Sequence, residues 1–502
     1  MNLKRLLYAA LFWGAMVGGV QAGHPLVRKI GEMPVRTGSP KIPVVLVQFK
    51  DKLMSETEPK ASYMARLSKP ATIEEVESGS GTAFQYFADQ SDGKFTPEFV
   101  VIGPVTLDEK AAYYGADGKT MKDEHVGEMI TEAIQKAIGT GEVEDWAEFD
   151  SNSDGLVDAL YVLYAGEGQH ALPAQTDLVW PHTSSLSERG YTSPEVAGLK
   201  FNSYSCTNEM LNGQLDGIGT FCHEFSHQLG LPDFYRTDGV VVSEFAMGSW
   251  SLMDYGSYAL DGRRPVGYRA LEKAHMGWID LQELDEATTV KNMPSTDWGG
   301  MAFKVVNSSP SAKGNEYLVL ETIDDRGWNK SCLGKGLLVT YVCLPDPTVW
   351  ENNTVNNVSS SAFRVKVIPA DNARPLLVSG KNEAEYEASL IGDTYPWNGN
   401  DELTDTSIPA TEMSFGLAGT LGKPITDIVY DEVSQTVSFD FMGGSEEHVI
   451  TIVPSVPMDE KVGYTTSGVW YRMDGVQVEK PMRKGVYLYR GADGRMIKRL
   501  LK

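Results

Sequence analysis

Two histidines and two carboxylates are grouped in the run His-Glu-Phe-Ser-His-Gln-Leu-Gly-Leu-Pro-Asp, which extends from His223 to Asp233. If the run begins as a helix, the four-residue spacing places His223 and His227 on one face, about one turn apart. Two imidazoles in that arrangement can bind one zinc ion. Glu224 lies beside them and is suited to accept a proton from a metal-activated water, as a general base rather than as a ligand.

The residues after the second histidine predict a third ligand. Gly230 follows His227 by three positions and can end the helix with a sharp turn, because glycine tolerates positive φ. That turn can bring the Asp233 carboxylate back to the metal, which leaves one zinc position open for water, as a catalytic site requires. The alternative is a solvated helix face with two unrelated histidines, and the added Gly and Asp weigh against it.

A methionine-containing segment follows the histidine run. Residues Trp250 to Gly256 read Trp-Ser-Leu-Met-Asp-Tyr-Gly, and they resemble the Met-turn of metzincin peptidases, in which a Met underlies the zinc site. Tyr255 lies two residues after Met253, where some metzincins have a tyrosine that stabilises the transition state. A packed core tyrosine is the alternative. Tyr258 is a weaker candidate for the same role.

Three further histidines have residue types that could contribute to the site. His182 is a weak candidate, whereas His170 and His275 are expected to be surface or structural residues.

The full pattern HExxHxxGxxD resembles the immune inhibitor A family of metallopeptidases, which is metzincin-like but uses Asp where most metzincins use a third His. The resemblance covers residues 43 to about 440. It implies that His223, His227 and Asp233 bind zinc and that Glu224 is the general base and acid of a secreted endopeptidase. The segments that carry it, besides the histidine run, are 84–95, 180–182, 253–258 and 334–342.

This chain also departs from the family pattern. The segment 321–324 is less typical of the family than the histidine run. The family's usual long N-terminal pro-region is nearly absent, which leaves the means of latency open.

A loop rich in side-chain oxygens, residues 150–158, predicts a calcium site. Side-chain oxygens occupy positions 1, 3, 5 and 9 of the loop, and Gly155 occupies position 6, where an EF-hand loop turns sharply. The expected ligands are Asp150, Asn152, Asp154, the Leu156 carbonyl and Asp158. Position 12 is Tyr161 rather than the EF-hand Glu. The pattern favours a structural calcium ion over the alternative, an Asx-rich turn without an ion.

An α/β arrangement over residues 42–285 is expected to position these side chains. A strand at 43–49 is predicted to be buried on both faces, and apolar periodicity predicts an amphipathic helix over 119–138. Thr82 is expected to cap a short helix that Gly93 ends. Further β segments are predicted at 95–107 (a strand pair), 156–164 and 177–180, and the histidine run is predicted to lie on a helix over about 218–229.

The remainder of the chain predicts β structure. Short strands separated by Gly, Asn, Asp and Pro indicate an all-β, sandwich-like domain over 286–445. A small C-terminal β domain is expected over 446–502, and its layout resembles the secretion or sorting domains of proteins exported by Bacteroidetes. The fold class is therefore a metzincin-like α/β (α+β) peptidase domain followed by two β domains.

The N-terminus predicts export. Lys4 and Arg5 precede an apolar run from Leu6 to Val20, followed by small residues at a cleavage site, which is typical of a signal peptide over 1–22. A membrane span would need about 20 apolar residues. Residues 23–41 are expected to form a short pro-segment or leader. We expect the protein to be secreted or at the cell surface, without a transmembrane segment.

Four cysteines are present in a chain that is expected to be exported, so disulfides are possible. Proximity along the chain favours Cys206 with Cys222 and Cys332 with Cys343. Free buried thiols are the alternative.

The net charge of the chain makes some classes of binding partner less favourable than others. The net charge of −24 disfavours nucleic acid and anionic lipid, because both bind basic surfaces. Protein or peptide substrates are expected, and the oligomeric state is left open. Two alternatives to a peptidase are a catalytically inactive surface binding protein on a peptidase fold and a zinc hydrolase that acts on other substrates.

Overall fold

A computed structural model describes residues 35–119, 122–240, 242–358, 362–377, 381–414 and 420–452, together with the backbone of four strands between 469 and 501. The chain divides into two compact units, residues 1–458 and 459–502. The predicted signal peptide and residues 23–34 of the predicted pro-segment lie outside the described residues.

The first sheet of the larger unit has six strands in the order β2-β1-β3-β7-β4, with β8 paired to β7. Its strands are β1 (Lys41–Gln48), β2 (Glu98–Thr106), β3 (Leu160–Glu167), β4 (His182–Ser185), β7 (Ser203–Leu211) and β8 (Gln214–Leu215). Strands β2, β1, β3 and β7 are parallel, whereas β4 and β8 are antiparallel to β7. β1 is buried from Ile42 to Val47, as predicted for a parallel strand covered on both faces.

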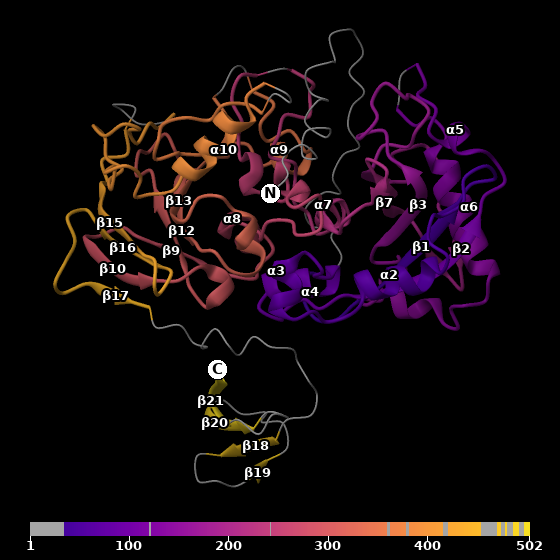
Figure 1. The fold of residues 1–502 in the computed structure, drawn as a ribbon, viewed down its shortest axis with the longest axis horizontal. Helices are drawn as coiled ribbons and strands as arrows, with labels where there is room; N and C mark the ends of the chain where they lie inside the picture. Colours follow the sequence, from indigo (N-terminus) through magenta and orange to yellow (C-terminus); the bar gives the residue numbers. More distant parts are fainter. Residues whose placement is uncertain are drawn as a thin grey trace. The chain divides into compact units, whose positions relative to one another are not determined.

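Helices cover this sheet and connect it to the site. α2 and α6 contact β2, and α7 contacts β7 and β4. Figure 1 shows α7 between this sheet and the β-rich part of the same unit. The helices in this part of the chain are α2 (Pro59–Leu67), α3 (Ile73–Ser78), α4 (Ala83–Gln90), α5 (Ala111–Tyr114), α6 (Val126–Gly139), α7 (Gly219–Gln228) and α8 (Ala270–His275), with the 3₁₀ turns η2 (Trp146–Phe149), η3 (Gly248–Trp250) and η4 (Tyr255–Tyr258).

Several predicted elements are confirmed and others are displaced. Thr82 caps α4, because its Oγ1 accepts a hydrogen bond from the Gln85 N–H at 3.1 Å. The predicted helix over 119–138 begins only at Val126. Asp123 has a φ of 50°, and an α-helix cannot include that backbone conformation.

Two β predictions were wrong in detail. Residues 95–107 do not form a strand pair: the segment contains one strand, β2, whose partner is β1. Residues 177–180 are not a strand, and the next strand, β4, begins at His182. Alternation of apolar residues indicates an extended segment, but it does not identify the partner strand.

Aromatic packing anchors α7 in the core. The Phe225 ring lies 5.2 Å from the Phe87 ring on α4 and 5.3 Å from the Phe99 ring on β2. Phe221 stacks on Tyr161 of β3 at a centroid distance of 4.0 Å. These buried rings fix the orientation of α7 and thereby the direction of the helix face that bears the two histidines.

The β-rich part contains two sheets, of order β14-β13-β12-β11-β9 and β15-β16-β10-β17. Both contribute to one hydrophobic cluster, and the Phe303 and Phe439 rings lie 6.0 Å apart. The strands are β9 (Leu281–Glu283), β10 (Thr288–Met293), β11 (Ala302–Val306), β12 (Glu316–Ile323), β13 (Gly336–Cys343), β14 (Val365–Val367), β15 (Ile425–Asp431), β16 (Thr436–Phe441) and β17 (Val449–Thr451). The remaining elements of the larger unit are α9 (Thr348–Glu351), α10 (Glu383–Gly392), η5 (Thr296–Trp298), η6 (Gly327–Ser331) and the paired strands β5 (Glu195–Val196) and β6 (Leu199–Lys200).

Buried hydrogen bonds join the β-rich part to α8 and the residue before it, which follow the histidine run in the chain. The Ala270 N–H at the start of α8 donates to Glu321 Oε1 on β12 at 3.0 Å. Arg269 Nη2 donates to Asn329 Oδ1 at 2.8 Å. Because these groups are buried, the hydrogen bonds satisfy polar atoms in an interior that the two parts share.

The C-terminal unit contains an antiparallel sheet of order β19-β18-β20-β21. Its strands are β18 (Val469–Arg472), β19 (Gln477–Val478), β20 (Gly485–Arg490) and β21 (Met496–Leu501). A role of this unit in sorting stays a prediction.

The four cysteines are buried free thiols in the structure, which is the alternative to pairing Cys206 with Cys222 and Cys332 with Cys343. Burial in apolar surroundings raises the pKa of the Cys206 and Cys222 thiols well above its ordinary value, which favours the unreactive thiol form. Over the described residues, every helix is too short or too polar to traverse a bilayer.

Candidate metal centre

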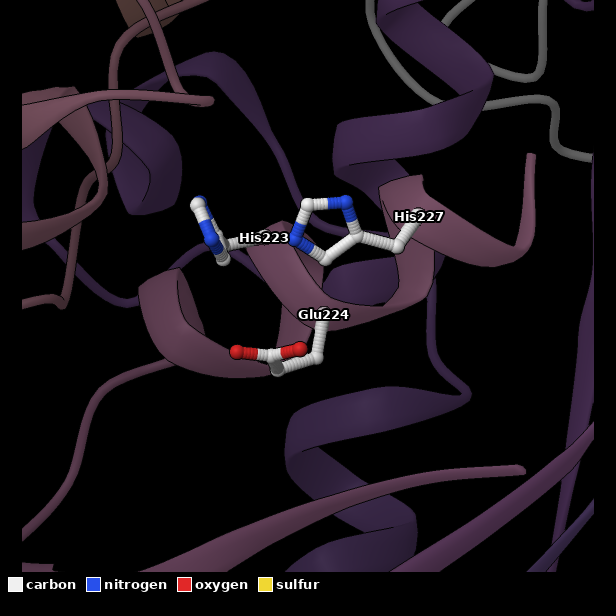
Figure 2. A group of neighbouring side chains, drawn as sticks. All are labelled: His223, Glu224 and His227. Carbon is white, nitrogen blue, oxygen red and sulfur yellow. The ribbon is translucent and has the colours of Figure 1, made fainter. Parts of the chain in front are cut away.

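α7 places His223, Glu224 and His227 together, and all three side chains are buried. The two imidazole rings have centroids 4.9 Å apart. One ligand atom from each of the three residues lies within 4.8 Å of the others. Figure 2 shows the two imidazoles next to each other, with the Glu224 carboxylate below them on the same stretch of helix.

Backbone carbonyls set the orientation of both imidazoles. His223 Nδ1 lies 2.8 Å from the Leu252 carbonyl oxygen, and His227 Nδ1 lies 2.7 Å from the Leu231 carbonyl oxygen. A carbonyl can only accept, so each Nδ1 carries the hydrogen and each Nε2 has a free lone pair in the neutral ring. This is the arrangement that metal-binding histidines adopt.

Asp233 completes the cluster after a turn. Gly230 has a φ of 93°, and the chain reverses there after α7, which brings the carboxylate back over the helix. Asp233 Oδ1 lies 3.2 Å from His223 Nε2 and 3.5 Å from His227 Nε2. The same oxygen is buried and has no hydrogen-bond partner among the described residues. Two imidazole lone pairs and an otherwise unsatisfied carboxylate oxygen fit a divalent ion such as zinc.

The charges of Asp233, His223 and Glu224 shift one another's pKa values. The two histidines hold the pKa of Asp233 well below its ordinary value, although burial opposes this shift. Burial lowers the pKa of His223, but its ion pair with Asp233 and the charge of the nearby Glu224 outweigh burial and raise the pKa to about 9. Burial raises the pKa of Glu224, and the neighbouring histidines oppose that change.

Zinc affinity is expected to fall as the pH falls. Zinc binding requires a neutral imidazole, and in the metal-free protein His223 is protonated below a pH of about 9. Each pH unit below that value should therefore weaken binding by about tenfold for the one proton released. Competition titrations with a chelating dye at several pH values measure this slope. A zinc affinity that is independent of pH below 9 would contradict the expectation.

The Met-turn segment contacts this cluster. Met253 is buried, and its carbonyl accepts a hydrogen bond from the Phe234 N–H at 2.8 Å. Leu252 provides the carbonyl that orients His223. Asp254 Oδ2 accepts hydrogen bonds from the Met247 and Gly248 N–H groups at 3.2 and 2.7 Å and so closes the turn.

The structure places other tyrosines nearer to the cluster than the predicted one. Tyr255 is half-buried, and desolvation together with the charge of the neighbouring Asp254 raises the pKa of its hydroxyl. The charges of Glu224 and Asp233 act instead on Tyr235 and Tyr258. The Tyr235 ring is nearly parallel to the His223 ring, at a centroid distance of 6.5 Å. A transition-state role for Tyr255 stays a prediction. Tyr235 was missed, although its position two residues after Asp233 was a usable signal.

The remaining histidines have distinct environments. His182 Nδ1–H donates to the Trp180 carbonyl at 2.7 Å, and its Nε2 lies 3.0 Å from the Tyr204 hydroxyl, so its ring is held within the core. His275 is a largely buried residue whose ring lies 4.6 Å from that of Trp350. His170 is 6% exposed, so it is not a surface residue.

His170 also differs from the others in its polar contacts. Neither ring nitrogen has a hydrogen-bond partner among the described residues. Its ring stacks on Tyr258 at 6.3 Å, which places it close to the tyrosine on which the charges of the cluster act. Burial lowers its pKa to about 4, with a smaller contribution from His223.

Thr183 also contacts the base. Its Oγ1 lies 2.7 Å from the Glu224 carbonyl oxygen and 3.1 Å from Glu224 Oε2. β4 supplies this residue by pairing with β7 next to α7. Sequence spacing offered no signal for Thr183, because 41 residues separate it from Glu224.

The predicted calcium loop is closed by its own hydrogen bonds. Asp150 accepts from the Asp154 and Gly155 N–H groups at 3.1 and 2.9 Å. Asp154 Oδ1 accepts from the Leu156 N–H at 2.9 Å. Asp158 Oδ2 accepts from the Ser151 N–H at 3.1 Å. These contacts are those of an Asx-rich turn, and calcium binding by Asp150, Asn152, Asp154, Leu156 and Asp158 stays a prediction.

The site has two buried imidazoles on one helix, each with Nε2 free to bind a metal ion. One carboxylate lies in the same helical turn, and a second faces the two Nε2 atoms. This arrangement is typical of metal-dependent hydrolases. Comparison with known proteins shows which family the catalytic part resembles. Residues 37–278 match the family model described as immune inhibitor A peptidase M6, catalytic domain. The match includes the whole metal cluster and ends before the β-rich part.

Two relatives agree with this match. The chain is 27% identical over 290 residues to immune inhibitor A of Bacillus thuringiensis subsp. alesti, covering 48% of this chain and 42% of the relative. It is 26% identical over 227 residues to the pre-pro-metalloprotease PrtV of Vibrio cholerae serotype O1, covering 40% of this chain and 24% of the relative. The chain thus matches less than half of either relative, and the comparisons support a metallopeptidase of the M6 family.

Proposed function

We propose that this protein is a secreted or cell-surface zinc endopeptidase that hydrolyses peptide bonds of extracellular proteins. One observation carries the proposal: Asp233 Oδ1 lies within 3.5 Å of both His223 Nε2 and His227 Nε2, and all three side chains are buried. When bound, zinc would polarise the scissile carbonyl and lower the pKa of a water molecule towards about 7.

Glu224 is proposed as the general base and acid. Its carboxylate is adjacent to the two imidazoles but is bonded to Thr183 rather than to Asp233. Burial raises its pKa, which improves its capacity to take a proton and return it to the leaving amine near neutral pH. Thr183 and the helix backbone limit its movement during that transfer.

The domain organisation is part of the proposal. Residues 1–22 would be a signal peptide, 23–41 a short pro-segment or leader, 42–285 the catalytic domain, 286–445 a β-rich domain and 446–502 a tail for sorting. The match over 37–278 supports the third assignment. The shared hydrophobic cluster of the two later sheets supports the fourth.

Digestion of casein by the purified chain tests the proposal. We expect cleavage that stops after zinc removal with a chelator and returns when zinc is added back, because the ligands are preformed in the fold. Circular dichroism would show that the metal-free chain keeps its structure. If the chain binds zinc stoichiometrically and cleaves none of a broad panel of proteins, it is an inactive binding protein on a peptidase fold.

A further inference from the structure

The third ligand of the proposed metal site is held by a segment that lies outside the family match. α9 and the residues after it, 348–357, pack against the turn that follows α7. Trp350 Nε1 donates to the Gly230 carbonyl at 2.9 Å, and Asn356 Nδ2 donates to the Phe234 carbonyl at 2.7 Å. This segment follows β13 of the β-rich part, whereas the matched catalytic domain ends at residue 278.

Within this segment, Asn353 bonds Asp233 twice. Asn353 Oδ1 accepts from the Asp233 N–H at 2.6 Å, and Asn353 Nδ2 donates to Asp233 Oδ2 at 2.7 Å. The carboxamide therefore fixes both the backbone and the carboxylate of Asp233. Because Oδ2 is occupied by Asn353, Oδ1 is the oxygen that faces the two imidazoles.

The position is suited to asparagine for two reasons. Asn353 is 5% exposed, and a carboxamide is the group that can offer one acceptor and one donor side by side. Its backbone φ is 53°, and asparagine tolerates this left-handed conformation better than most residues.

We propose that Asn353 is a positioning residue for Asp233 and that the β-rich part completes the metal centre through it. The inference rests on the proposed function in taking the ion to be zinc. Outer-shell partners of this kind orient the ligand and reduce the motion that the carboxylate must lose on binding. The metal centre is thus expected to depend on two parts of the chain that are 120 residues apart.

Three variants of the full chain test the role of Asn353. Asn353→Gly removes the carboxamide but tolerates the left-handed backbone. Asn353→Asp keeps the shape but replaces the Nδ2 donor with an oxygen that faces Asp233 Oδ2. Asn357→Ala is the matched control, because Asn357 bonds the Thr237 N–H at 2.9 Å and the Thr237 hydroxyl at 3.0 Å in the same segment without touching Asp233.

Zinc dissociation constants from chelator competition are the first readout, and melting temperatures of the metal-free proteins are the second. We expect Asn353→Gly to weaken zinc binding by about 10- to 100-fold and Asn353→Asp by at least as much, whereas Asn357→Ala keeps wild-type affinity. A merely structural segment would lower all melting temperatures and leave zinc affinity unchanged, and that result would overturn the inference. If the wild type itself binds no zinc, the proposed function fails instead.

Discussion

Glu224→Gln is expected to reduce the rate of peptide hydrolysis by about 10²- to 10⁴-fold, which is the contribution typical of a general base. The substitution keeps the size of the side chain and removes its capacity to accept a proton. Zinc affinity should be retained, because Glu224 Oε2 is bonded to Thr183 and the free lone pairs of the imidazoles face Asp233 instead. The measurements are kcat on a quenched fluorescent peptide and the zinc content of the purified variant.

Glu74→Gln is a suitable control for this substitution, since Glu74 is an exposed residue in the first turn of α3. The same chemical change there should leave both kcat and zinc content at wild-type values. Full activity in Glu224→Gln would refute its role as the base. A loss of zinc in the same variant would instead identify Glu224 as a ligand.

Asp233→Asn is expected to abolish zinc binding and, with it, hydrolysis. The new side-chain oxygen can still accept the hydrogen bond from Asn353 Nδ2, which then directs the new amide NH₂ group towards the His223 and His227 lone pairs. An NH₂ group donates to those lone pairs and cannot coordinate a metal ion. The loss of affinity should exceed the 10- to 100-fold effect typical of an outer-shell partner. Isothermal titration with zinc measures it.

The metal-free form of Asp233→Asn is expected to remain folded, because the substitution preserves volume and the contact to Asn353. Far-UV circular dichroism and the melting temperature after chelation check this point. Asp280→Ala is the control, since Asp280 is exposed and its loss should leave zinc binding intact. Wild-type zinc affinity in Asp233→Asn would show that the third ligand lies elsewhere.

Local sequence signals were sufficient for the helix that carries the histidines. The apolar residues at spacings of three and four predicted a helix over about 218–229, and α7 extends from Gly219 to Gln228. The turn at Gly230 was also predictable, because only a few residue types adopt positive φ at low cost. The convergence of His223, His227 and Asp233 follows from these local features, which all lie within one helix and one turn.

Nonlocal partners were not predictable in the same way. The period of apolar residues identified 95–107 as extended but could not show that β2 pairs with β1 rather than with a neighbouring strand. The start of α6 depended on Asp123, whose left-handed backbone is stabilised by its tertiary contacts, including hydrogen bonds from the Trp180 N–H at 3.1 and 3.3 Å. Cysteine proximity along the chain likewise gave no information on distance in space, and the four thiols are unpaired.

By itself, the sequence determined the chemistry that is available: two imidazoles one helical turn apart, a carboxylate beside them and another after a glycine turn. Residues that are close along the chain have few possible arrangements, so spacing and backbone preference decide them. Only the tertiary structure decided which groups orient these side chains. Thr183 contacts Glu224, the Leu252 carbonyl accepts from His223, and Asn353 donates to Asp233. Each of these contacts joins segments that are far apart in sequence, and packing of the whole unit brings them together.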